Sequence, residues 1–341
     1  MDKKGYISRI REELHNGRKH SKTTIESIAK GFGITNKNLV KEFTELAIVL
    51  NAREIAHDSS LTTYEKYLDI VALYQSQVNL SMRTSMSVLM QQYSTPAPIS
   101  FLASSYILSA NTIPLYLEPS AGNGLLTIAL PYHFTHVNEL DDVRLENLKD
   151  QPFAKVSSWD ALKPPAAYDR KFDGVITNPP FGSLSEPILF GKFKIKRLEH
   201  AMALNALRCM KDNGKAVIII GGHTTWDKHG RVTAGTNRIF LNYLYHFYKV
   251  EDIIPINGKK LYSRQGTSIN TRLVLIGGAK SVPEGAAPLK NNLHSSVVST
   301  HEELWDRVWL EPEHKSGETQ TKNLLKLIAK AIQIKQKQLS K

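Results

Sequence analysis

The stretch Leu115-Tyr116-Leu117-Glu118-Pro119-Ser120-Ala121-Gly122-Asn123-Gly124 predicts a short strand, a tight turn of small residues and the start of a helix. Ala121, Gly122 and Gly124 let a ligand approach the backbone closely, and a helix N-terminus favours a carboxylate or phosphate. Such turns also join strands to helices where no ligand binds, and this one lacks the dinucleotide pattern Gly-x-Gly-x-x-Gly. Its meaning therefore depends on the strands that follow.

Short apolar runs alternate with helical segments from Leu115 onward, which indicates an α/β fold: a doubly wound, mostly parallel seven-stranded sheet covered by helices. Ligands of such sheets bind beyond the carboxyl ends of the strands. The helices expected between the strands include Asp141–Leu148 and Leu198–Met210. The predicted strands are Leu115–Leu117, His136–Asn138, Ala154–Ser157, Gly174–Thr177, Ala216–Ile220, Val250–Ile256 and Thr271–Ile276.

Acidic residues stand at the ends of the first three predicted strands: Glu118, Glu139 and Asp160. Glu139 follows the glycine turn at the distance where a carboxylate can accept the hydroxyls of a ribose. One acid at such a position is usually a helix cap, but three in succession favour a nucleoside ligand.

The fourth strand leads into Asn178-Pro179-Pro180-Phe181. Two prolines stiffen the turn and leave carbonyl groups without neighbouring N–H donors. An amide oxygen and a fixed carbonyl can accept both hydrogens of an exocyclic amino group, which leaves the nitrogen lone pair facing an electrophile. Phe181 offers a face for stacking a planar substrate. A Pro-Pro loop with a core Phe is the alternative for these four residues taken alone.

Together with Gln92-Tyr93-Ser94-Thr95-Pro96 upstream, these motifs resemble the amino-group DNA methyltransferases that use S-adenosylmethionine. Their order is that of the gamma group of adenine-N6 enzymes, the N-6 DNA methylase family. The resemblance covers roughly residues 91–278 and implies a Rossmann-like methyltransferase sheet. Phe181 replaces the commoner Tyr of the family, which keeps the stacking face and loses a hydroxyl.

The resemblance implies roles for single residues. The catalytic residues would be Asn178, Pro179, Pro180 and Phe181: Asn178 and Pro179 would hold the target amine, and Phe181 would stack on a flipped base. Tyr262 is the candidate for a second stacking aromatic, although an exposed or a core Tyr is an equal reading. The residues implied in cofactor binding are Tyr93, Ser94, Thr95, Pro96, Glu118, Ala121, Gly122, Gly124, Glu139, Asp160 and Asn178.

The implied chemistry is one in-line methyl transfer to adenine N6, with no covalent intermediate and no metal. Adenine within a duplex is out of reach, so base flipping is implied. Methylation of cytosine carbon 5 needs a nucleophilic cysteine in a loop. The only cysteine, Cys209, falls in a helical run and is expected in the core, which excludes that reaction.

Positive charge is concentrated after Gly182. Residues 183–280 hold 16 Lys and Arg against six Asp and Glu, which is +10 of the net charge of +12. A polyanion such as DNA, with RNA not excluded, should meet this part of the chain. Solvated surface is the plain alternative for each cluster. The expected contacts are Lys192, Lys194, Lys196 and Arg197 in a hairpin, and Lys228, Arg231 and Arg238 in a glycine-rich loop.

Three parts are expected: a helical N-terminal domain, residues 1–89; a methyltransferase domain, 90–281; and a linker with a basic helical tail, 282–341. Ser27–Ile34 with the helix after it resembles a helix-turn-helix, but two packed helices without DNA contact are favoured. The charged start, residues 1–20, predicts no secretory signal, and no apolar run is long enough to span a membrane. The expected location is the cytoplasm, in association with the nucleoid.

Gamma enzymes generally carry a target-recognition domain after the last strand, whereas about sixty residues remain here after Ser281. Sequence choice would then come from the helical N-terminal part, from inserted loops or from a partner subunit. Two rival functions stay open. One is methylation of an RNA amino group or a protein glutamine; the other is a catalytically idle DNA-binding subunit of a larger modification complex.

Overall fold

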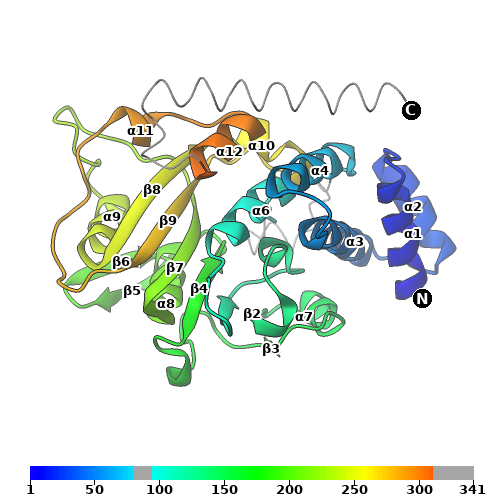
Figure 1. The fold of residues 1–341 in the computed structure, drawn as a ribbon, viewed down its shortest axis with the longest axis horizontal. Coiled ribbons are helices and arrows are strands. Elements are labelled where there is room, and N and C mark those ends of the chain that lie inside the picture. The colour runs from blue at the N-terminus through cyan, green and yellow to red at the C-terminus, as the bar shows by residue number, and fades with distance from the viewer. Residues whose placement is uncertain (80–93, 310–341) are drawn as a thin grey trace. The chain divides into compact units, whose positions relative to one another are not determined.

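A seven-stranded sheet forms the centre of the computed structural model, which describes residues 1–79 and 94–309 (Figure 1). The order of the strands across the sheet is β3-β2-β1-β4-β7-β9-β8. The strands are β1 (Tyr116–Glu118), β2 (Thr135–Asn138), β3 (Lys155–Ser157), β4 (Phe172–Thr177), β7 (Met210–Gly221), β8 (Tyr248–Ile256) and β9 (Thr271–Ala279). All seven predicted strands are therefore present.

The sheet is mostly parallel. β1 pairs in parallel with β2 and β4, β2 with β3 and β4 with β7, whereas β9 runs antiparallel to both β7 and β8. The chain winds outward from β1 to β3 and then returns to the other side of β1 to form β4. A crevice opens at this reversal, at the carboxyl ends of β1 and β4. The predicted fold class is confirmed.

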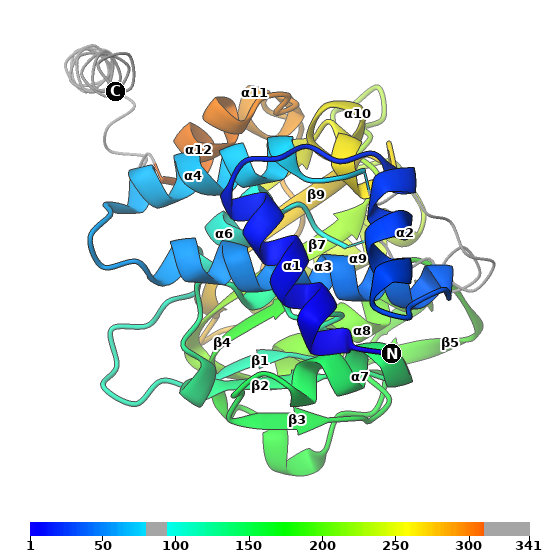
Figure 2. The same ribbon diagram turned by 90° about the vertical axis from the view of Figure 1, so that its right-hand side faces the viewer.

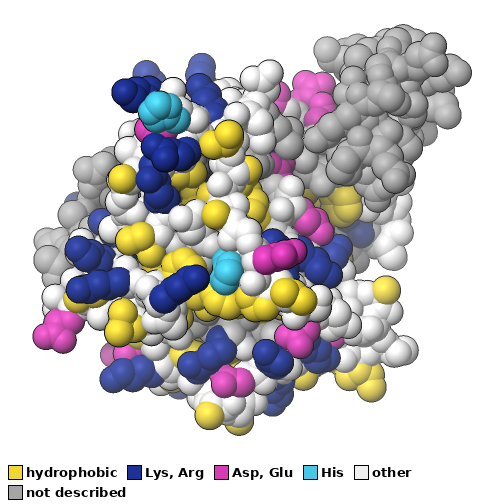
Figure 3. Space-filling model, turned by 90° about the vertical axis from the view of Figure 1, so that its left-hand side faces the viewer, with side chains coloured by type: hydrophobic (Ala, Val, Ile, Leu, Met, Phe, Trp, Pro, Cys, Tyr) yellow, Lys and Arg dark blue, Asp and Glu magenta, His cyan; other side chains and the backbone are white. Residues whose placement is uncertain are grey.

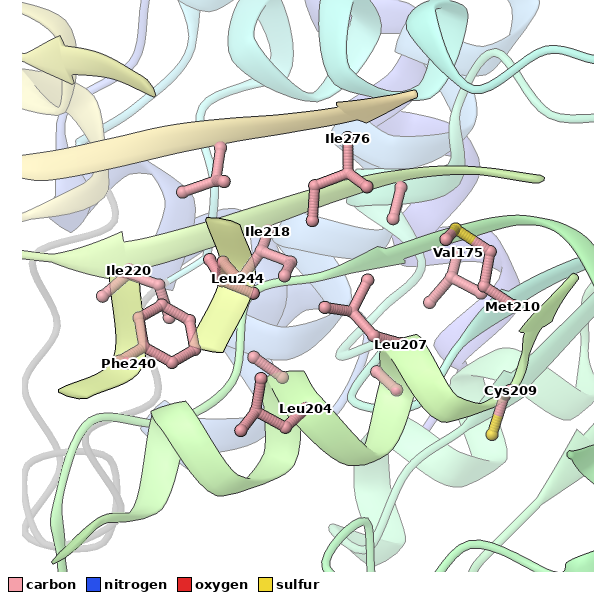
Figure 4. Packing of buried hydrophobic residues seen from close by; sticks show 14 of the residues in the cluster. Val175, Leu204, Leu207, Cys209, Met210, Ile218, Ile220, Phe240, Leu244 and Ile276 are labelled. Atoms are coloured by element: carbon pink, nitrogen blue, oxygen red, sulfur yellow. The ribbon is translucent and has the colours of Figure 1, made fainter. Parts of the chain in front are cut away.

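One face of the sheet is covered by α8 (Leu198–Arg208) and α9 (Thr236–Phe247). Leu204 and Leu207 of α8 belong to the same buried apolar cluster as Ile218 of β7 (Figure 4). Cys209 follows α8 and is fully buried, and burial raises the pKa of its thiol to about 12. The prediction that Cys209 belongs to the core is thus confirmed.

The opposite side of the sheet carries α6 (Ala97–Tyr106) and the helices before it, α1 (Lys3–His15), α2 (Lys22–Gly31), α3 (Lys37–His57) and α4 (Thr63–Ser76) (Figures 1 and 2). Local sequence sets where they begin. Asn36 caps α3 by accepting hydrogen bonds from two backbone N–H groups, and Thr62 with Glu65 forms a capping box at α4.

Helix α3 is buried on nearly all sides, between α1, α4, α6 and α7 (Asp142–Lys149). Its charged residues Lys41, Glu42 and Glu45 are buried together with its apolar ones. A helix enclosed in this way cannot enter a DNA groove. The helix-turn-helix reading is therefore wrong, and the favoured reading of packed helices is correct.

The remaining elements connect the sheet strands. β5 (Ser183–Phe190) and β6 (Phe193–Arg197) form the predicted basic hairpin as a separate two-stranded sheet. The short helices are η1 (Leu125–Thr127), η2 (Tyr132–Phe134), η3 (Ala166–Tyr168), α10 (Gly258–Leu261), η4 (Ser263–Gln265) and α11 (Asn292–Ser295). Helix α12 (His301–Trp309) ends the described part, and the predicted basic helical tail lies outside the described residues.

The chain divides into two compact units. Residues Met1–His301 form one unit and Glu302–Lys341 a second. The N-terminal helices belong to the same unit as the sheet because α3 packs directly on α6 and α7. No helix among the described residues is long and apolar enough to cross a membrane.

Candidate active site

A cavity of about 940 Å³, counted out to open solvent, lies at the carboxyl ends of β1, β2 and β4. Four segments contribute most of its wall: 94–95, the glycine turn 119–123, the end of β2 at 138–140, and 178–181. These are the segments in which sequence analysis placed its candidate residues. The cavity lies where the strand order reverses, as expected for a ligand site in an open α/β sheet.

Gly122 opens the floor of this cavity. Its φ of +57° is strained for other residues, and a Cβ at this position would meet no atom within 4 Å. A ligand can therefore approach the backbone there. Gly124 differs, because its φ is +92° and a Cβ would come within 3.3 Å of the Phe153 ring. This second glycine allows close packing and does not open the cavity.

Asn138, at the end of β2, fixes the spacing of three strand ends. Its Nδ2 donates to the carbonyl of Pro119 at 3.0 Å and to that of Trp159 at 2.9 Å. Its Oδ1 accepts from the Trp159 N–H at 2.8 Å. Asn138 and the exposed Leu140 both line the cavity. Neither was predicted as a site residue from the sequence, although both flank Glu139.

The three predicted acids occupy different environments. Glu139 lines the cavity; its Oε2 accepts from Gly122 N–H at 2.8 Å, and its Oε1 accepts from Leu140 and Asp141 N–H at 2.7 and 2.9 Å. A carboxylate has about four acceptor positions, so these bonds leave about one. Asp160 is exposed and caps a turn by accepting from Leu162 N–H at 2.9 Å.

Glu118 lies behind the glycine turn and is fully buried. Its Oε1 accepts from the N–H and hydroxyl of Ser120 at 3.0 and 3.1 Å, whereas its Oε2 has no partner among the described residues. Burial raises the pKa of Glu118 to about 8, although the bonds from Ser120 favour the ionised form.

This raised pKa predicts a pH-dependent effect of Glu118→Gln on stability. Between pH 4.5 and about 8 the unfolded chain has lost a proton that the folded chain retains, so wild-type stability falls as pH rises through this window. Glu118→Gln has no carboxyl group to titrate at this position, so it does not lose this stability as the pH rises. Its unfolding free energy in denaturant should match wild type near pH 4.5 and exceed it by roughly 2–5 kcal/mol above pH 8. A difference between the two proteins that does not change with pH would contradict this.

Asn178 follows β4 and lines the cavity. Its Nδ2 donates to the hydroxyl of Thr95 at 3.0 Å, which fixes the orientation of the amide. Phe181 and Gly182, which follow in the turn, contact neighbouring elements. The ring of Phe181 lies so close to Gly221 that a Cβ there would be 3.1 Å from it, and Gly182 N–H donates to the buried Glu199 at 2.9 Å. These contacts hold the turn in place.

Segment 94–96 continues the wall. Ser94 and Thr95 line the cavity, and Ser94 Oγ donates a hydrogen bond to Glu45 of α3. Pro96 is buried at the start of α6 and does not line the cavity; Tyr93 lies outside the described residues. Glu45 was not predicted, because nothing local marks a glutamate in a helix as part of a site about fifty residues away.

Tyr262, the proposed second stacking residue, is corrected by the structure. Only 2 % of its surface is exposed, and its hydroxyl accepts from Thr271 at 3.4 Å. It does not line the cavity. The short helices α10 and η4 are hydrogen-bonded to Tyr74 of α4, and the buried Tyr262 ring between them presents no face on which a base could stack. Of the two readings open from sequence, the core tyrosine is correct.

The predicted basic residues fall into two groups. Lys192, Lys194, Lys196 and Lys228 are exposed. The three arginines are bound within the chain: Arg197 pairs with Glu199 at 2.8 Å, and Arg231 and Arg238 both pair with Asp227 at 3.2 Å. These ion pairs show that the three arginines stabilise the segments that carry them. Figure 3 shows Lys and Arg side chains spread over a face of the molecule with apolar side chains between them.

No protein-family model and no curated protein matches this sequence. Among solved structures, the chain is similar to a Listeria monocytogenes protein assigned to the class I S-adenosylmethionine-dependent methyltransferases, with 14 % identity, a TM-score of 0.50, and coverage of 87 % of this chain and 94 % of that one. It is also similar to a modification subunit assigned to a type I restriction enzyme of Vibrio vulnificus (13 %, TM-score 0.46, coverage 82 % and 61 %) and to the M protein of the type I restriction enzyme EcoKI (15 %, TM-score 0.43, coverage 84 % and 69 %).

The likeness to the Listeria protein shows a shared fold, that of the class I S-adenosylmethionine-dependent methyltransferases. The two modification subunits are more distant, and the chain spans about three fifths of the Vibrio one.

Proposed function

We propose that this chain is a DNA methyltransferase that transfers a methyl group from S-adenosylmethionine to the N6 amino group of a flipped adenine. The observation that carries the proposal is the turn Asn178-Pro179-Pro180-Phe181, which lines the same cavity as the open glycine turn. An Asn-Pro-Pro-Phe turn beside this cavity suits transfer to an exocyclic amine.

The described residues fit S-adenosylmethionine. Gly122 allows a close approach to the backbone, Glu139 keeps about one acceptor position for a ribose hydroxyl, and Leu140 and Trp159 offer apolar surface to a purine. S-adenosylmethionine, when bound, supplies an electrophilic methyl group. Asp160 is proposed to act at the rim, since its neighbours Trp159 and Ala161 line the cavity while its own carboxylate caps a turn.

The chain's own residues then position the amine. Thr95 holds the Asn178 amide nitrogen, so Asn178 Oδ1 and the Pro179 carbonyl accept the two hydrogens of adenine N6. The Phe181 ring stacks on the base, and its packing on Gly221 keeps that ring in place. Holding both hydrogens directs the nitrogen lone pair away from the ring system and toward the cofactor end of the cavity.

The direct test is incubation with methyl-labelled S-adenosylmethionine and, in parallel, duplex DNA, single-stranded DNA, RNA or protein, followed by nucleoside and amino-acid analysis. The proposal predicts N6-methyladenine in at least one DNA substrate. Label found only in RNA or in glutamine would establish the rival function. If the protein binds the cofactor but labels none of the substrates, the role proposed for the Asn178 turn is incorrect.

The basic hairpin β5–β6 is the part of the surface proposed to contact DNA phosphates. Phe193 packs against Tyr243 of α9 with ring centroids 5.2 Å apart, which leaves Lys192, Lys194 and Lys196 exposed next to the residues that follow Phe181. Each phosphate contact adds about 0.9 to the slope of log affinity against log salt on duplex DNA.

Replacing Lys192, Lys194 and Lys196 with alanine should therefore reduce the salt slope of DNA binding by roughly 2 to 3. Fluorescence anisotropy over a range of salt concentrations gives this slope. The matched control replaces the exposed Lys4, Lys30 and Lys37 of the N-terminal helical region, which removes the same charge. Equal slopes for the two triple variants would show that only net charge matters and that the hairpin makes no phosphate contact.

A further inference from the structure

The wall of the cavity contains a carboxylate that neither the glycine turn nor the Asn178 turn supplies. Glu45 projects from α3 to the cavity wall and is 1 % exposed. Its Oε1 accepts from Ser94 Oγ, whereas its Oε2 has no hydrogen-bond partner among the described residues. A buried, unpartnered acceptor is costly and rare in native proteins, so it points to a ligand group that donates to it.

The position of Glu45 in the cavity limits which ligand group can donate to it. Glu45 binds Ser94, and the next residue, Thr95, binds Asn178. Glu45 is therefore linked through segment 94–95 to Asn178, the residue at the proposed site of transfer. S-adenosylmethionine carries two cations, the sulfonium and the α-ammonium group. Only the ammonium has N–H donors.

The cations beside Glu45 act on it through space but make their ion pairs with Glu42. Lys41 and Arg144 are the nearest cations, and both pair with Glu42, Arg144 at 2.9 Å and Lys41 at 3.4 Å. Burial and the neighbouring Glu42 raise the pKa of Glu45. A cationic ligand donating to Oε2 would stabilise the ionised form and remove this penalty.

We propose that Glu45 is the counter-ion of the α-ammonium group of S-adenosylmethionine, so that a helix from the N-terminal region selects the amino-acid end of the cofactor. This inference rests on the proposed function, because it assigns a residue within the same cavity.

The test is calorimetric binding of four compounds to wild type and Glu45→Gln. S-adenosylmethionine has both cations, and S-adenosylhomocysteine has the ammonium alone. The desamino analogue of S-adenosylhomocysteine has neither, and methylthioadenosine lacks the whole amino-acid part. Charge-assisted hydrogen bonds to buried groups predict that Glu45→Gln weakens binding of the first two by roughly 10- to 100-fold and leaves the other two within about threefold. Glu54→Gln, on the exposed side of the same helix, is the matched control and should change none of them.

Three results would overturn the assignment. Loss of affinity for S-adenosylmethionine alone would make Glu45 a partner of the sulfonium. An equal loss for all four compounds would give it a structural role. The third result is that wild type binds S-adenosylhomocysteine and its desamino analogue equally. This would show that no residue recognises the ammonium group, and it does not depend on whether the Gln variant folds. If wild type binds neither S-adenosylmethionine nor S-adenosylhomocysteine, the proposed function itself fails.

Discussion

Replacing Asn178 with alanine is expected to lower methyl transfer by roughly 10²- to 10³-fold or more, while S-adenosylmethionine binds within about threefold of wild type. The reason is that the amide oxygen acts on the target amine, whereas most of the cavity wall comes from the glycine turn and the end of β2. Single-turnover transfer to DNA and calorimetric binding of the cofactor measure the two effects separately.

Asn178→Asp is the control for this experiment, because it keeps an acceptor oxygen while losing the Nδ2 bond to Thr95. It should transfer methyl groups faster than the alanine variant. If Asn178→Ala lost cofactor binding together with transfer, the role assigned to Asn178 would be incorrect, and the residue would belong to the cofactor site alone.

The second large effect concerns the buried ion pair between Glu42 of α3 and Arg144 of α7. Glu42 accepts from Arg144 Nε at 2.9 Å and from Asn123 Nδ2 at 2.8 Å, and both Glu42 and Arg144 are about 5 % exposed or less. Glu42→Ala would leave the guanidinium of Arg144 buried without its partner. Removing one member of such a pair costs about 3–5 kcal/mol.

The unfolding free energy of Glu42→Ala in urea should therefore fall by about 3–5 kcal/mol with an unchanged m-value. Glu54→Ala removes an exposed partner of Arg11 from the same helix and should cost less than about 1 kcal/mol. Similar small losses for both variants would mean that α3 is held by its apolar contacts and that the charged network contributes little.

The sheet could be predicted because its information is local. Each strand is a short apolar run, and the run Ala216–Ile220 lies wholly within β7. The glycine turn and the Asn178 turn were also found, since each depends on residues adjacent in sequence. β4 was predicted to start at Gly174 and starts at Phe172, the kind of shift that pairing with neighbouring strands produces.

The contribution of α3 to the cavity wall could not be predicted from the sequence. Its apolar spacing at Leu39, Phe43 and Leu46 indicates one buried face, and charged residues on the other faces suggest solvent. In the fold, Glu42 pairs with Arg144, 102 residues further along the chain. Contacts of this separation leave no local signal. Tyr262 failed as a site residue for a related reason, because its burial depends on how α10 and η4 pack on α4.

The bond between Glu42 and Arg144 also bears on the order in which the chain can assemble. Helix α3 is synthesised well before α7, so its charged residues Lys41, Glu42 and Glu45 have no sheet to bind when they emerge. These charged side chains keep α3 hydrated until the sheet has formed, and they discourage aggregation of the unfinished chain. The cavity wall contains Arg144 and also residues 178–181, so a nascent chain acquires its complete ligand site only after β4 and the turn that follows it have been made.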